Sequence, residues 1–341
     1  MKNVLQGVLI SVLSVLVIFG ILETVVRLSG YKSFPYVVFQ MRGTRMEPRP
    51  LFNPDTAVGI KLDSGTYKIY YEDGTYWQAT NNKFGWRITS NDTSLYLESC
   101  LHHIDIFGCS FSYGTGLADS QTYPFLLQHR MPDYRINNYA VPGHGMAQNF
   151  VKLTEQISID SGAVIVYAYI AGHDFKTNHA NRKKMYPSKN YLKGYYYLYL
   201  TESLEVVRTR YDYEPWPLVQ YSALFNFLED KYLAFLDNDK SRHQASKKAV
   251  VYLNELCQKK HAKFIFTVLD REEVSADMLL FCKQNKIACA DISVDISTPK
   301  YNLMPYDDHP NFAANKLFAE KLYAYLVQNN YVTKYSVAKD K

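Results

Sequence analysis

The order of apolar segments in the later part of the sequence constrains the fold most strongly. From residue 103 to residue 328, short apolar runs alternate with longer segments of helical periodicity. One run, "AVIVYAYI" (163–170), is almost continuously apolar, which is typical of a strand buried on both faces of a sheet. Strands that alternate with helices predict a parallel sheet with helices on both faces. We therefore expect an α/β fold, a three-layer α/β/α sandwich with a mostly parallel sheet.

The same pattern predicts where the elements begin and end. The expected elements are strands 103–108, 134–141, 163–170, 263–270 and 287–293, and helices 123–130, 146–159, 246–260, 272–285 and 311–328. Residues 175–242 interrupt the alternation with tyrosine-rich stretches and a helical segment, 222–236. This interval predicts an insertion off the sheet that forms a lid or a substrate wall.

The amino terminus is strongly apolar. Val4–Leu22 contains no charged residue and is about as long as the roughly 20 residues that span a bilayer as a helix. It is longer than the core of a signal peptide, and no small-x-small cleavage site follows, so we expect an uncleaved anchor. Lys2 precedes the span, whereas Arg27 and Lys32 follow it, which favours a cytoplasmic domain. Long following domains translocate regardless of such charges, so the charge count leaves the side open.

The segment between the anchor and the first sheet strand has a different character. Residues 31–54 are rich in proline, and residues 59–88 alternate Tyr, Ile and Thr around turns at 63–65 and 73–74. That pattern predicts a linker and then a small antiparallel meander. The expected organisation is an anchor at 1–30, a linker and β-rich segment at 31–98, an α/β catalytic domain at 99–330 with its insertion at about 175–242, and a tail at 331–341.

Composition excludes several classes of partner. The formal net charge of +5 over 341 residues is modest, and no segment concentrates Lys and Arg among aromatic residues, so we expect no nucleic-acid partner. The five cysteines show no C-x-x-C pair and no metal-ligand spacing, and we expect no metal and no cofactor. The 30 tyrosines fit packing in β-rich structure, with a sugar-facing surface as the alternative.

Polar residues gather where the expected strands end. Ser110, Gly143 and the pair His173-Asp174 each follow a strand, and "YDDHPN" (306–311) follows the last one. In open α/β sheets ligands bind beyond the carboxyl ends of the strands. A serine, a glycine amide, a polar donor and an Asp-His pair are the groups that acyl transfer needs as nucleophile, oxyanion donors, base and orienting acid.

Four segments resemble the sequence blocks of the SGNH, or GDSL-type, esterases and acetyl-ester transferases. They are "FGCSFSYGTGLADSQTYPFLLQ" (107–128), "INNYAVPGHG" (136–145), "YIAGHDF" (169–175) and "DDHPNFAANKLFAEKL" (307–322). "TNNKFGWRI" (80–88) also resembles the segment that leads into the first strand in membrane-anchored bacterial members. The resemblance covers about residues 81–326 and implies an SGNH, flavodoxin-like sandwich.

The resemblance implies a role for each matching position. Ser110 would be the nucleophile and His309 the general base, while the amides of Ser110 and Gly143 would donate to the oxyanion. Cys109 stands where the family has an aspartate, a supporting position. Neighbouring side chains on a strand face opposite ways, so Cys109 and Ser110 cannot both point at His309. Ser112 replaces the second glycine of the α/β-hydrolase elbow, which counts against that alternative.

Two further positions depart from the family pattern. His173 stands in the place of the oxyanion asparagine and can donate only as the right tautomer, for which Asp174 is the expected partner. Tyr306 lies three residues before the histidine, where the family has its acid, so the orienting carboxylate must come from Asp307, with Asp308 as the less favoured choice.

These observations favour a membrane-anchored serine esterase or acyltransferase that acts on small O-acyl groups, acetyl esters of a cell-envelope glycan. Hydrolysis and transfer share an acyl-serine intermediate, and the sequence leaves the two open. The alternatives are a catalytically impaired glycan-binding or polysaccharide-assembly factor and a lipid-directed esterase. Bacterial relatives with such an anchor imply a single-pass protein of the inner membrane with its catalytic domain in the periplasm.

Overall fold

A computed structural model describes residues 2–34, 45–48, 51–92, 102–174, 196–210, 215–236 and 239–332 of the chain. The chain divides into two compact units, each of which is described by itself. The larger unit holds the sheet predicted from the alternating pattern, and the smaller holds the apolar amino-terminal helix. Much of the predicted linker, the first part of the predicted insertion (175–195) and nearly all of the predicted tail lie outside the described residues.

The larger unit is built on a five-stranded sheet in the order β12-β11-β8-β6-β7. Its strands are β6 (His103–Phe107), β7 (Arg135–Asn138), β8 (Val164–Tyr169), β11 (Lys263–Val268) and β12 (Cys289–Asp291). Every neighbouring pair is parallel, as predicted. Because β6 lies between β7 and β8, the strand order reverses at β6, and the carboxyl ends of β6 and β8 form the switch point where ligands bind in such sheets.

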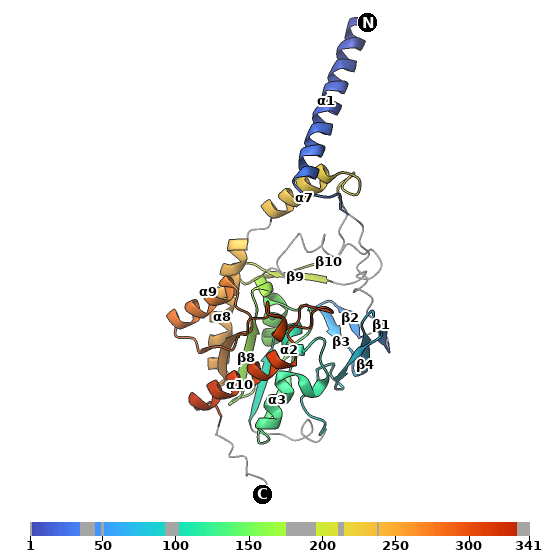
Figure 1. The fold of residues 1–341 in the computed structure, drawn as a ribbon. Helices are drawn as coiled ribbons and strands as arrows, with labels where there is room; N and C mark the ends of the chain where they lie inside the picture. Colours follow the sequence, from blue (N-terminus) through green and yellow to red (C-terminus); the bar gives the residue numbers. More distant parts are fainter. Residues whose placement is uncertain are drawn as a thin grey trace. The chain divides into compact units, whose positions relative to one another are not determined.

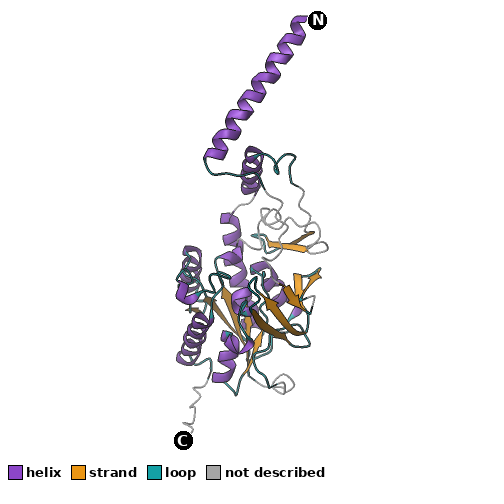
Figure 2. Ribbon diagram, turned by 45° about the vertical axis from the view of Figure 1, so that its right-hand side comes forward, coloured by secondary structure: helices purple, strands orange, loops and turns teal. Residues whose placement is uncertain are grey.

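Helices cover both faces of this sheet, so the predicted three-layer sandwich is confirmed. The helices are α2 (Ser110–Tyr113), α3 (Tyr123–Arg130), α4 (Met146–Val151), α8 (Asp239–Lys259), α9 (Glu273–Gln284) and α10 (Phe312–Gln328). Strand β8 shows how the layers arise, since successive side chains point to opposite faces. Tyr167 packs in a core with α4, α8 and α9, whereas Val166 packs in a second core with α3 and α10. The strands lie between helices in Figures 1 and 2.

Two helix boundaries differ from the prediction. The helix expected at 146–159 is α-helical only to Val151 and continues as a π-helical segment, Lys152–Gln156. Such segments insert one residue per turn and do not change the apolar pattern that suggested a single helix. Helix α8 begins at Asp239, before the predicted start at 246. The prediction began too late because the first turns of this helix are polar and carry no apolar period.

Short antiparallel strands complete the larger unit. They are β1 (Arg45–Glu47), β2 (Phe52–Asp55), β3 (Gly59–Leu62), β4 (Gly65–Tyr70), β5 (Tyr76–Asn81), β9 (Tyr196–Leu200) and β10 (Val206–Arg210). Strands β4 and β5 form the hairpin predicted within 59–88, and β9 pairs with β10. The predicted linker is not wholly irregular: its β1 adds to β4, and its β2 pairs with β3, which therefore stands apart from the meander. After β5, single bridges link Arg87 to Asn81 and to Asn138 of the main sheet. The meander is thereby joined to β7.

The smaller unit contains α1 (Lys2–Leu28) and α7 (Ala223–Leu236), the helix predicted at 222–236. Within the described residues, α1 is the helix long and apolar enough to cross a membrane, a property shared by single-pass anchors and signal sequences. The carboxyl-terminal end of α1 packs against α7 (Figure 1).

Candidate active site

Three of the predicted site residues lie shortly after strands of the parallel sheet. Ser110 begins α2 three residues after the end of β6, Gly143 lies five residues after β7, and His173 lies four residues after β8. Ser110 and His173 therefore lie beyond the two strands that flank the switch point. His309 lies between β12 and α10. Ser110 is 5% exposed and His173 is fully buried.

The turn from β6 into α2 needs a glycine. A Cβ at Gly108 would lie 2.6 Å from the Ser112 hydroxyl oxygen and 3.1 Å from the Ala168 carbonyl oxygen of β8. A larger residue here would force the Ser112 side chain or the neighbouring strand to shift. Gly114 ends α2 with φ of 80°, and its N–H donates to the Ser110 carbonyl at 2.9 Å. The glycines that frame Ser110 thus set a short, tightly wound turn.

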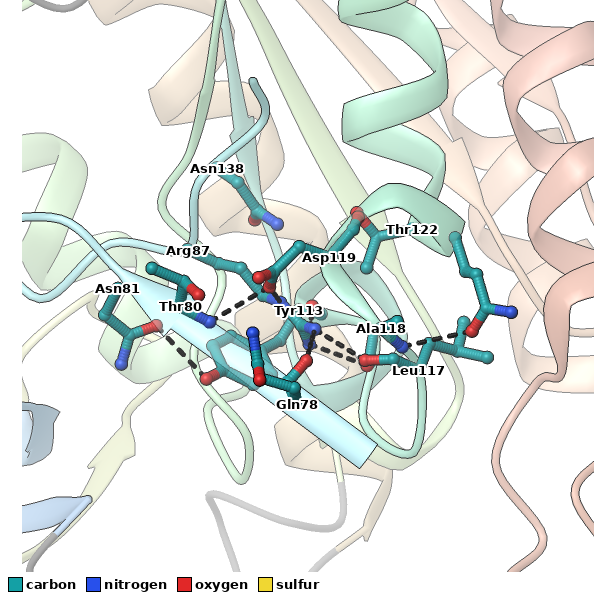
Figure 3. A network of polar contacts seen from close by, with 12 residues as sticks. Gln78, Thr80, Asn81, Arg87, Tyr113, Leu117, Ala118, Asp119, Thr122 and Asn138 are labelled. Carbon is teal, nitrogen blue, oxygen red and sulfur yellow. Dashed lines mark hydrogen bonds and ion pairs between the residues drawn. The ribbon is translucent and has the colours of Figure 1, made fainter. Parts of the chain in front are cut away.

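Arg87 holds the chain that follows α2 (Figure 3). Its guanidinium donates to the carbonyls of Tyr113, Gly114 and Leu117 at 3.0, 2.8 and 2.6 Å. It also forms an ion pair with Asp119 at 3.0 Å. The Arg87 side chain is fully buried, so these partners replace its water. The sequence signal for this role was a single arginine in the aromatic segment "KFGWRI" (83–88), and its importance was missed.

Two side chains fix the other side of the turn. The Tyr123 hydroxyl donates to the Ser112 hydroxyl at 2.9 Å, and the Asn138 amide donates to the Ser112 carbonyl at 2.9 Å. Ser112 is therefore a buried packing residue. Cys109 is also fully buried and belongs to the apolar core on the α3 and α10 face. Cys109 and Ser112 thus serve in packing, whereas Ser110 stands at the start of α2, beyond the carboxyl end of β6.

The structure brings His309 together with Asp307. The Asp307 carboxylate contacts Nδ1 of His309 and also accepts its backbone N–H at 2.7 Å. Asp308 lies 3.9 Å from the same Nδ1, and its side chain is 95% exposed. The geometry therefore selects Asp307 as the carboxylate that orients the imidazole. The His309 ring packs edge-on against Phe111, with ring centroids 5.6 Å apart, so it lies beside the residue that follows Ser110.

The same contact sets the charge of Asp307. Burial alone would raise the pKa of the Asp307 carboxyl, but the hydrogen bond and charge of His309 outweigh it and hold that pKa below its usual range. Burial, together with the negative charge of Asp307, raises the pKa of the nearby Tyr71 to about 12. The carboxylate is thus ionised and Tyr71 neutral at any pH near 7.

Tyr306, at the position of the family's acid, holds the loop in place. Its ring stacks on Tyr71 with centroids 4.5 Å apart, and its hydroxyl donates to Asp73 at 2.8 Å. Both partners belong to the turn between β4 and β5. The residue that breaks the family spacing therefore ties the histidine loop to the meander, a contact that the sequence pattern did not indicate.

The ring of His173 is fixed by a residue other than the expected one. The Tyr167 hydroxyl lies 2.9 Å from Nδ1 of His173. Burial raises the pKa of Tyr167 well above its usual range, so the phenol keeps its proton. A protonated phenol can donate to Nδ1, and in that arrangement the ring proton is on Nε2. Asp174, predicted to fix the ring, instead contacts His243 at 2.6 Å and the Ser246 hydroxyl at 2.5 Å.

Gly143 has a φ of 86°, a conformation that favours glycine, as expected for a turn residue that offers its N–H. Asp307, Asp308 and His309 also bring one potential metal-ligand atom each within 4.8 Å of one another. Because Nδ1 of His309 already contacts Asp307, we assign this group to the orientation of the imidazole.

No protein-family description matches the sequence, and no curated protein does. The solved structures that it resembles include TesA, at 14% identity with a TM-score of 0.40 over 66% of this chain and 98% of that one. Another is a G-D-S-L family lipolytic protein from Veillonella parvula, at 10% identity with a TM-score of 0.39 over 66% and 97%. A third is the esterase EstA from Pseudoalteromonas sp., at 13% identity with a TM-score of 0.38 over 67% and 98%.

Proposed function

We propose that this chain is a membrane-anchored serine esterase or acyltransferase of the SGNH type. The observation that carries the proposal is the pairing of Asp307 with His309 beside Phe111, the residue that follows Ser110 at the end of β6. A histidine held through Nδ1 by a carboxylate directs Nε2 toward the proton of a nucleophile. Ser110 is the hydroxyl that we assign as this nucleophile, because it precedes Phe111 in the chain and follows β6.

In the proposed reaction, the Ser110 oxygen attacks the carbonyl carbon of an ester while Nε2 of His309 takes the hydroxyl proton. The tetrahedral intermediate collapses, its carbon–oxygen bond breaks, and the alcohol leaves with the proton from His309. The acyl group is then bound to Ser110. Water or a sugar hydroxyl attacks this acyl-serine, gives its proton to His309, and releases the serine again. Asp307 stabilises the imidazolium that forms in both halves.

The oxyanion would be held by the backbone N–H groups of Ser110 and Gly143 and by the side chain of His173. The contact between Tyr167 and Nδ1 of His173 supports this third role, because it favours the tautomer with a proton on Nε2. Donors aimed at the developing negative charge each contribute about a hundredfold to a thousandfold in rate. A neutral imidazole with its N–H aimed at the oxyanion would be one such donor.

The proposed substrate is a small O-acyl ester, an acetyl ester of a cell-envelope glycan. Tyr306 supports a saccharide, because this residue of the loop that carries His309 is 49% exposed although one face of its ring stacks on Tyr71, and aromatic faces pack on the apolar faces of sugars. The apolar helix α1 supports attachment to a membrane, and the resemblance to anchored bacterial relatives is the ground for proposing the inner membrane with the catalytic unit in the periplasm. Glu23 of α1 accepts hydrogen bonds from the start of α7, about 200 residues later, which favours an α1 that is retained in the mature protein.

The test is hydrolysis of p-nitrophenyl acetate, with labelling by a fluorophosphonate that reacts with activated serines. Ser110→Ala should lose at least about a thousandfold in rate and all labelling, as expected when the nucleophile of a triad is removed. Cys109→Ala is the matched control, because it changes the adjacent buried residue and should keep both. An unchanged rate in Ser110→Ala would remove the serine from its proposed role.

A second function is favoured by one observation, the histidine at the position of the family's oxyanion asparagine. It is a saccharide-binding or assembly factor without turnover. This alternative predicts that the wild-type chain binds an acetylated glycan but neither reacts with the fluorophosphonate nor hydrolyses the ester. Stoichiometric labelling of Ser110 would eliminate it.

A further inference from the structure

Helix α7 exposes apolar side chains along one face. Phe225, Leu228, Tyr232 and Phe235 recur at intervals of three and four residues and therefore share that face. We call these residues the apolar stripe. Leu228, Tyr232 and Phe235 are 44%, 47% and 84% exposed. A helix at the surface of a globular protein turns such a face toward the core, so the orientation of α7 is the reverse of the usual one.

Two polar side chains of α7, Asn226 and Asp230, are turned toward the protein instead. The Tyr31 hydroxyl donates to the Asp230 carboxylate at 2.7 Å, and the Asn226 amide donates to the Lys32 carbonyl at 2.9 Å. Both partners lie in the short segment that follows α1. These contacts fix the rotation of α7 about its own axis, so the apolar stripe cannot turn inward without breaking them.

The start of α7 is bonded to α1. The N–H groups of Ala223 and Leu224 donate to the Glu23 carboxylate at 2.9 and 2.8 Å, and the Ser222 hydroxyl donates to it at 2.6 Å. A carboxylate is well placed at a helix amino terminus, where it satisfies N–H groups that lack partners in the helix. Glu23 directly follows the uncharged run Val4–Leu22.

The length of that run indicates where along α1 the surface of the bilayer would lie. At about 1.5 Å per residue it spans about 28 Å, close to the thickness of ~30 Å of the hydrocarbon core of a bilayer. Glu23 would then mark the boundary between lipid tails and headgroups. Its bonds to the first turn of α7 hold the start of that helix at the same boundary between lipid tails and headgroups.

The apolar surface of α1 also continues into the apolar stripe. The Phe19 ring of α1 contacts the Phe225 ring of α7, with centroids 5.7 Å apart. Aromatic residues with a polar edge flank the stripe: Trp216 contacts Tyr232 with centroids 5.2 Å apart, and Tyr221 is 76% exposed. Tryptophan and tyrosine are enriched at the level of lipid headgroups.

We propose that α7 is an interfacial helix whose apolar stripe is seated in the bilayer that α1 spans. The proposal rests on the anchoring function proposed for α1. Helices that lie in a membrane surface bury an apolar face to about 5–10 Å and keep their polar groups out of the lipid, as α7 does with its contacts to residues 31 and 32. A lipid occupant is favoured over a second copy of the chain because the stripe is continuous with the lipid-facing surface of α1.

Photo-crosslinking of the full-length chain tests this. The photoreactive residue p-benzoylphenylalanine replaces Phe235 in the stripe, Leu13 in the span or Tyr76 on β5, all more than half exposed at 84%, 52% and 52%. Each variant is reconstituted into phosphatidylethanolamine and phosphatidylglycerol vesicles with a trace of alkyne-tagged phosphatidylethanolamine. The circular dichroism spectrum of each variant serves as the check of folding, so the check does not depend on the proposed activity.

Lipid adducts are expected from positions 235 and 13, severalfold above those from position 76. Adducts from position 13 without adducts from position 235 would overturn the interfacial role of α7 but leave the anchor intact. Crosslinks from position 235 to a second copy of the chain would overturn it in favour of an oligomer. Lipid adducts absent from position 13 would overturn the anchor itself, and with it the proposal for α7.

Discussion

The two halves of the candidate active site are supported in different ways. The turn around the proposed nucleophile, which we call the nucleophile turn (residues 107–123), is mostly buried and is held by side chains distant in sequence, chiefly Arg87 with its bonds to three carbonyls and Asp119. The histidine loop, residues 302–311, has the Tyr306 contacts to the meander and is otherwise held by bonds among its own residues, as from the Leu303 N–H to the His309 carbonyl at 3.0 Å and from the Asn311 amide to the Asn302 carbonyl at 2.9 Å. One half depends on the core of the fold and the other on local contacts.

This difference predicts whether stability or activity is lost when the contacts of each half are removed. Damage to the support of the nucleophile turn leaves buried polar groups without partners, so it should lower the stability of the whole larger unit. Damage within the histidine loop exposes its groups to water, which can replace lost hydrogen bonds at little cost. It should lower activity while the fold persists.

The largest effect is expected from Asp307→Asn. Without the carboxylate, the imidazole loses both its orientation and the charge that stabilises its protonated form, and the loss in kcat should be on the order of 10⁴-fold. That corresponds to about 5 kcal/mol of activation free energy. The measurement is ester hydrolysis at saturating substrate, together with the free energy of unfolding, which should change little.

Asp308→Asn is the matched control for this change. Its side chain is 95% exposed and lies 3.9 Å from Nδ1, so the rate should stay close to that of the wild type. Equal losses in the two variants would contradict the assignment of Asp307, and a larger loss in Asp308→Asn would reverse it.

The next largest effect is expected from Arg87→Met, and it should appear as stability. Removal of one partner of a buried ion pair that also satisfies carbonyls typically costs about 3–5 kcal/mol of unfolding free energy. The measurement is denaturant unfolding of the full-length chain in detergent. Arg130→Met is the control, because Arg130 is 42% exposed in its single pair with Glu320, and such pairs contribute about 0–1 kcal/mol. Similar stabilities for the two variants would show that the nucleophile turn does not depend on Arg87.

A smaller effect is expected at the tether between the histidine loop and the meander. Tyr306→Phe keeps the ring that stacks on Tyr71 but loses the hydrogen bond to Asp73, so kcat should fall only a fewfold. Tyr306→Ala loses both contacts and should lower kcat further, with the unfolding midpoint nearly unchanged. A drop in unfolding midpoint as large as that of Arg87→Met would mean that the loop is part of the core support after all.

The sequence predicted the parts of the site that depend on strand order. Ser110, Gly143 and His173 follow strands, and the carboxyl ends of parallel strands lie at the same edge of the sheet, so their common location was readable from the alternating pattern. Asp307 was favoured over Asp308 on reach alone, and the described geometry agrees with that choice.

The supporting contacts could not be predicted in the same way. Arg87 bonds mainly to backbone carbonyls, which every residue possesses, so no pattern of side chains marks its partners. Tyr167 was interpreted as one more apolar residue of a buried strand, although its hydroxyl bonds His173. Asp174 was expected to hold the ring next to it in sequence, but it turns to His243 of α8, about 70 residues later.

The smallest effect, and the one that bears most directly on local support, is the pH dependence of stability due to Asp307. Its pKa is lower in the folded chain than in the unfolded one, so the unfolded chain binds more protons at acidic pH. The stability that this carboxylate contributes is fully present above the unfolded value, about 4 for an aspartate, and is lost as the pH falls through the lower folded value. Denaturant midpoints of wild type and Asp307→Asn, measured from about pH 3 to about pH 5, isolate the contribution of this carboxyl, because other carboxyls titrate in both proteins and imidazoles ordinarily titrate at higher pH. The difference between the two proteins should be largest near about pH 5 and shrink below about pH 4. A difference that grows as the pH falls would mean that Asp307 titrates above its usual range, and the contact with His309 would then not stabilise the ionised carboxylate.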